Sequence, residues 1–101
     1  MVIEKRLHAR VPVGAPLTCH RPDGRSFAGN AKDISIGGMF LETPQPVEFG
    51  DELRIEILLP RAKQPFALPA VVRWVKPGGF GVQFGLLGAR ETHAISELLR
   101  G

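Results

Sequence analysis

The chain is poor in the residues on which several kinds of protein depend. It has no tyrosine and one cysteine, and the single cysteine excludes an internal disulfide and a zinc site built from several thiolates. No apolar run approaches the roughly 20 residues that a membrane-spanning helix needs, and the first residues lack the apolar core of a signal peptide. We therefore expect a cytoplasmic protein without membrane insertion.

What the sequence does contain fits one small folded domain, residues 1–101. With 44% hydrophobic and 23% charged residues, a chain of this length can bury one modest core. The net charge of +3 favours anionic partners without identifying one. A nucleic-acid binder needs a denser basic stripe with aromatic platforms, and the phenylalanines stand mostly at core-like positions. Neither DNA nor RNA is expected as a partner.

Twelve glycines and nine prolines divide the chain into short segments, most of which carry the pattern of β-strands. The segment 53–57 alternates apolar and charged residues, which is typical of a strand with one wet face. The expected strands are 17–20, 26–36, 39–42, 53–57, 66–75 and 80–84. Residues 89–100 change to a helical period. We predict an all-β (mainly β) fold, with six antiparallel strands closed into a barrel because closure removes exposed edges, and a C-terminal α-helix.

Residues 1–11 are polar and basic and predict a flexible arm before a barrel over 12–86. Arg6 and Arg10 lie four positions apart in this arm. Guanidinium groups bind phosphate oxygens in bidentate fashion and stack on flat bases. In a chain with nine arginines this spacing also arises by chance, so a solvated pair is the alternative interpretation.

A second polar pattern follows from Asp33 to Gly38. On a strand, Asp33 and Ser35 point to one face while Ile34 and Ile36 point to the other, toward the core. A carboxylate at this place can accept two hydrogen bonds from the edge of a guanine, and Gly38 allows a sharp turn or a close approach to a ligand. The alternative is a strand that ends in a bulge, with two merely solvated polar residues.

Together the two patterns resemble the motifs of PilZ domains: the RxxxR motif, and Asp or Asn, any residue, Ser, any two residues, Gly. The order agrees, and the resemblance extends from about Glu4 to Leu99. It implies a six-stranded antiparallel barrel with a C-terminal helix, and the ligand cyclic di-GMP, a bacterial second messenger. The binding residues that it implies are Lys5, Arg6, Arg10, Asp33, Ser35 and Gly38. In PilZ domains the residue at the position of Lys5 varies and influences how many ligand molecules bind, so the resemblance is compatible with one or two nucleotides.

No catalytic arrangement is visible. Cys19 and His20 are neighbours on a strand and point to opposite faces, and Ser35 lacks a nucleophile-elbow context. We therefore predict a non-enzymatic receptor with no metal and no cofactor besides its ligand. It would signal through a separate downstream protein or through self-association as a homodimer. The alternative is a PilZ-like protein-interaction module without nucleotide binding. Cys19 and Trp74 are interpreted as core residues.

Overall fold

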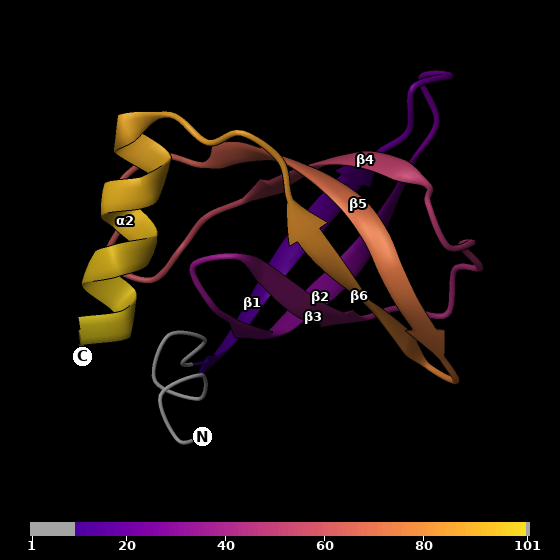
Figure 1. The fold of residues 1–101 in the computed structure, drawn as a ribbon, viewed down its shortest axis with the longest axis horizontal. Helices are drawn as coiled ribbons and strands as arrows, with labels where there is room; N and C mark the ends of the chain where they lie inside the picture. Colours follow the sequence, from indigo (N-terminus) through magenta and orange to yellow (C-terminus); the bar gives the residue numbers. More distant parts are fainter. Residues whose placement is uncertain (1–9, 101) are drawn as a thin grey trace.

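The structure is a computed structural model, and it describes residues 10–100. Six strands form a closed barrel, followed by one helix (Figure 1). All neighbouring strands are antiparallel, in the order β1-β2-β3-β6-β5-β4, and β4 pairs with β1 to close the barrel. The elements are β1 (Val11–His20), β2 (Ser26–Ile34), β3 (Gly38–Glu42), β4 (Glu52–Ile57), β5 (Phe66–Lys76), β6 (Gly79–Phe84) and α2 (Ala89–Arg100). The predicted fold class is confirmed.

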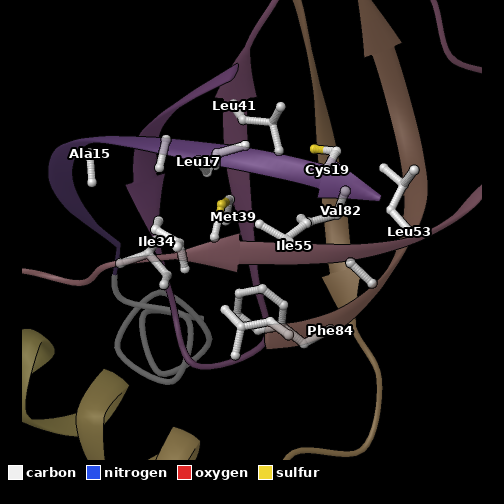
Figure 2. Packing of buried hydrophobic residues seen from close by; sticks show 14 of the residues in the cluster. Ala15, Leu17, Cys19, Ile34, Met39, Leu41, Leu53, Ile55, Val82 and Phe84 are labelled. Carbon is white, nitrogen blue, oxygen red and sulfur yellow. The ribbon is translucent and has the colours of Figure 1, made fainter. Parts of the chain in front are cut away.

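Alternation along the strands fills the barrel with apolar side chains. In β4 every second residue is buried, as its sequence predicts, and the same holds for the second half of β1. Figure 2 shows Cys19 of β1, Met39 of β3 and Ile55 of β4 pointing into a common interior. Burying a side chain of this size stabilises the fold by about 1.5–3 kcal/mol, so the closed core is the main source of stability.

The first strand begins earlier than predicted, at Val11 rather than at Leu17. The segment before Leu17 contains Pro12 and Pro16, which lack the N–H donor that a fully paired strand uses. However, only Leu17–His20 of β1 pairs with β4, so the first half of the strand has β2 as its one partner. Proline is tolerated where one side of a strand is unpaired. Val11, the last residue of the expected arm over residues 1–11, therefore belongs to β1. Residues 1–9 lie outside the described part.

Helix α2 packs against one end of the barrel (Figure 1). Ile95 is completely buried in the core cluster, and Leu98 and Leu99 pack against it. The antiparallel order brings the start of β1 and the turn between β2 and β3 to this same end. Within residues 10–100, no helix combines the length and the hydropathy needed to cross a bilayer.

Cys19 is buried, as predicted, and has no accessible surface. Burial raises the pKa of its thiol from 9.0 to about 12, and the nearby charge of Arg21 opposes this only in part. The folded protein therefore retains a proton that the unfolded chain loses above pH 9. The contribution of Cys19 to stability is complete below pH 9 and is lost as the pH rises from about 9 to about 12, with a slope of at most about 1.4 kcal/mol per pH unit.

We expect urea unfolding to show a steeper loss of stability above pH 9 for the wild type than for Cys19→Ala. The variant shares every other titrating group and is the matched control. We also expect Ellman's reagent to leave the folded thiol unmodified at pH 8 and to react once the chain is unfolded, because a buried thiol lacks both access and thiolate character. Rapid labelling of the folded chain would contradict this account.

Candidate functional site

Three of the predicted site residues come together at the end of the barrel beside α2. The Arg10 Nε donates a hydrogen bond to the Asp33 Oδ1 at 3.0 Å, and its Nη1 donates to the Ser35 Oγ at 3.4 Å. Arg10 directly precedes β1, whereas Asp33 belongs to β2 and Ser35 to the turn that follows. The pairing of β1 with β2, Pro12 opposite Asp33, sets this proximity. The structure thus joins the described parts of both sequence motifs in one cluster.

The turn after β2 differs from the predicted strand. The strand ends at Ile34, and the Ser35 amide donates to the Gly38 carbonyl at 2.8 Å. Because the alternation stops there, Ser35 is 4% exposed rather than wet, and Ile36 is 37% exposed rather than in the core. The Ser35 hydroxyl also donates to the Gly38 carbonyl, at 3.3 Å. Ser35 is therefore the buried member of the cluster, whereas the Asp33 side chain is partly exposed to solvent.

Gly38 is required by the packing of two strands. A Cβ atom built on it would lie 2.1 Å from the Val82 carbonyl oxygen of β6, whereas at Gly37 such an atom meets nothing within 4 Å. The neighbouring turn is tied to the same strand, since the Phe84 amide donates to the Gly37 carbonyl at 2.8 Å. The close approach at Gly38 is thus one between β3 and β6. A contact between Gly38 and a ligand stays a prediction.

The prediction of a buried Trp74 is wrong. Its side chain is 45% exposed and lies flat across Gly81, where an added Cβ would come within 2.0 Å of the indole. A register shift between Val72 and Trp74 marks a bulge in β5, and a bulge changes the direction of the following side chains. Gly81 leaves room for the indole because it has no side chain. This glycine was the one signal in the sequence that a bulky residue of the neighbouring strand could lie across it.

Trp74 belongs to the same cross-strand row as the arginine cluster. Asp33 of β2 pairs with Phe40 of β3, Phe40 pairs with Gly81 of β6, and Gly81 pairs with Trp74 of β5. Phe40 is half-buried, and the Lys76 Nζ lies 4.9 Å from the centroid of its ring. Because strands are spaced by about 4.8 Å, an indole lying over β6 is roughly 10 Å from Asp33. A flat aromatic surface and a carboxylate thus share one outer face.

Lys5 and Arg6 lie outside the described residues, so the structure does not place them. The other polar candidates are used locally: His20 pairs with Glu56 at 3.0 Å, and His93 is exposed on α2. Between residues 10 and 100, no three histidine, cysteine or carboxylate side chains are grouped to hold a metal ion. The phenylalanines are less buried than predicted, since only Phe80 and Phe84 are buried and Phe49 is 70% exposed.

Solved structures of other proteins share this barrel. The PilZ domain of CeSA from a cellulose-synthesizing bacterium aligns with a TM-score of 0.71 at 20% identity, covering 91% of this chain and 95% of that one. The PilZ domain of YcgR from Escherichia coli, solved with c-di-GMP, gives 0.75 at 14% identity, covering 92% and 87%. The MrkH–c-di-GMP complex of K. pneumonia gives 0.74 at 18% identity, covering 92% and 49%. These likenesses show the fold.

Sequence comparison identifies the family. A cellulose synthase catalytic subunit (UDP-forming) of Xanthomonas axonopodis pv. citri (strain 306) is 39% identical over 77 residues, which are 74% of this chain and 10% of that protein. The chain thus spans about a tenth of the length of this curated relative. The family model of the PilZ domain matches residues 4–101, which includes both motifs and every element of the barrel. The chain belongs to the PilZ domain family.

Proposed function

We propose that this chain is a receptor for cyclic di-GMP. The observation that carries the proposal is the convergence of Arg10, Asp33 and Ser35, which come from positions up to 25 residues apart and meet at distances of 3.0 and 3.4 Å. A guanidinium beside a carboxylate matches a guanine nucleotide, because phosphate oxygens accept from the first and the guanine N1 and N2 groups donate to the second. The c-di-GMP complexes of similarly folded proteins support the choice of ligand.

The pairing of Arg10 with Asp33 leaves both groups available to the ligand. Their side chains are 36% and 30% exposed, and an ion pair this open to solvent contributes roughly 0.2–1 kcal/mol. A bidentate contact between an arginine and a guanine is worth about 1–3 kcal/mol. The ligand contact therefore outweighs the pair that it replaces, and in the free protein the pair holds the arginine close to its binding position.

One arginine contact and one stacked base do not by themselves reach micromolar affinity, which needs about 8 kcal/mol. Arg10 and one stacked base supply roughly 2–6 kcal/mol. We propose that Arg6 supplies a second guanidinium and that Lys5 adds charge without planar stacking. We further propose that Trp74 is the platform for one guanine, since Gly81 covers one face of its indole and leaves the other open.

We expect Trp74→Ala to weaken cyclic di-GMP binding by roughly 5- to 100-fold, the loss of one stacked base. Gly81→Ala is expected to act in the same direction, because its Cβ would displace the indole. The double variant should bind no worse than Trp74→Ala alone, since a displaced platform and a missing one are equivalent. Calorimetry measures the affinities, and additive losses in the double variant would contradict a shared cause. Trp74 is the one tryptophan, so quenching of its fluorescence by ligand is a second readout.

We propose further that the module is not an enzyme and passes the state of its ligand site to a separate protein, in the cytoplasm. The cluster lies at the barrel end against which α2 packs, so a bound nucleotide would alter a surface shared by several elements. Self-association into a homodimer is the other route by which such a module can signal. A PilZ-like interaction module without nucleotide affinity is the alternative function.

Titration calorimetry of the protein with cyclic di-GMP separates these functions. A receptor gives saturable heat, and an interaction module gives none. A single-stranded oligonucleotide is the necessary second titrant, because the exposed Phe49 and Trp74 remove part of the argument against nucleic-acid binding. A steep salt dependence with a preference for the oligonucleotide would identify a nucleic-acid binder and overturn the proposal. The stoichiometry decides between one and two bound nucleotides.

A further inference from the structure

A second binding surface lies apart from the arginine cluster. A groove of about 630 Å³ separates α2 from the loop that joins β4 to β5. Arg10, Asp33 and Ser35 do not line it. Its apolar lining includes Phe66 at the start of β5 and Ala94 of α2, which are both half-buried. The groove therefore offers an apolar floor that nucleotide binding at Asp33 leaves unused.

The charge of this groove is strongly one-sided. Arg61, Lys63 and Arg90 line it, and among its described lining residues Glu97 is the one acid. The Glu97 carboxylate is itself paired with Arg100 at 3.5 Å. The lining side chains thus carry a net positive charge around an apolar floor, which complements a ligand that is acidic and apolar at once.

Local contacts hold the cationic walls in place. The Arg90 guanidinium carbon lies 5.6 Å from the centroid of the Phe66 ring, a cation–π contact that favours this position of the guanidinium group. On the opposite wall, the Ala62 amide donates to the carbonyl of the buried Leu59 at 3.0 Å. A wall that is already ordered loses little entropy on binding. The groove is therefore preformed rather than dependent on a ligand to create it.

We propose that this groove binds an acidic segment of a partner protein. An aliphatic or aromatic side chain of that segment would pack on Phe66 and Ala94, and flanking carboxylates would pair with Lys63 and Arg90. Arginine next to an aromatic residue is typical of the energetic centre of protein interfaces, and recognition of acidic motifs by grouped cations is a recurrent mode. The proposal goes beyond nucleotide binding and does not require it.

A random heptapeptide library displayed on phage, selected on the purified full chain, tests the proposal. We expect selected peptides to combine Asp or Glu with one Leu, Ile, Met or Phe. Fluorescence polarisation should show that Lys63→Glu together with Arg90→Glu weakens their binding by about tenfold or more, since two favourable charge contacts become repulsive. Selected peptides without acidic enrichment, or with affinities unchanged by the two reversals, would overturn the proposal.

Two controls separate this surface from the nucleotide site and from net charge. Lys32→Glu with Arg54→Glu makes the same change in charge on exposed positions of β2 and β4 that do not line the groove, and it should leave peptide binding within about twofold because distant surface charges are screened. Asp33→Ala should likewise retain peptide binding. A loss of cyclic di-GMP affinity with intact peptide binding therefore identifies failure of the nucleotide site alone.

Discussion

Replacing Arg10 with alanine is expected to weaken cyclic di-GMP binding by roughly tenfold to a hundredfold, the equivalent of one lost bidentate contact. Arg10 bridges the two sequence motifs in the structure, since it contacts both Asp33 and Ser35. Asp33→Ala should produce a loss of similar size, because it removes the acceptor for the guanine edge. Calorimetric titration of the two variants measures both effects.

The same substitutions should barely affect the barrel. The Arg10–Asp33 pair is more than one quarter exposed on each side, and pairs of this kind contribute about 1 kcal/mol or less. Thermal unfolding of either variant should therefore lie within a few degrees of the wild type. Wild-type affinity in a folded Arg10→Ala variant would show that the ligand does not use this cluster.

Arg25 offers a matched control for this prediction. It also forms an ion pair with an aspartate, Asp23, at 2.8 Å, but it lies in the β1–β2 turn at the opposite end of β1. Arg25→Ala makes the same change in charge and should leave affinity unchanged. Arg10→Lys retains the charge without the planar fork, so an intermediate affinity would show that geometry as well as charge matters.

The sequence predicted the regular parts of this fold well, because the same physics acts locally and globally there. The alternation of β4 is visible in five residues, and the structure buries Leu53, Ile55 and Ile57 as that pattern requires. The helix was predicted with the bounds that α2 has, because the spacing of apolar residues changes there from the strand period to the helical period. The motif residues Arg10, Asp33 and Ser35 were named from the chain alone, and the structure brings them into contact.

The parts that the sequence did not predict depend on two irregularities of the backbone, a bulge in β5 and the turn after β2. Trp74 stands in an apolar run, and its exposure follows from a bulge in β5 and from the space above Gly81 on another strand. Ser35 is buried and Ile36 exposed because a turn closes through Gly38 one residue after the strand ends. Neither the bulge nor the turn has a periodic pattern in the sequence. A prediction from alternation therefore continues the alternation past the point where it ends in both places.

Gly38→Ala is the substitution expected to damage the fold most. The added Cβ would lie 2.1 Å from the carbonyl oxygen of Val82, and a backbone atom of a paired strand cannot move aside as a flexible side chain can. Relief requires β3 and β6 to separate where Gly38 pairs with Gln83. We expect a loss of about 3 kcal/mol, a large share of the 5–15 kcal/mol that stabilises a typical domain. Urea unfolding and thermal melting measure it.

Gly37→Ala is the control, since its Cβ meets nothing within 4 Å, and it should unfold like the wild type. The comparison also decides how the motif glycine acts. If Gly38 serves strand packing, Gly38→Ala loses stability first and loses nucleotide affinity because the turn that carries Ser35 is displaced. A Gly38→Ala variant with wild-type stability and no affinity would instead assign Gly38 a direct contact with the ligand. The geometry favours packing, because the space in front of its Cα is already occupied by Val82.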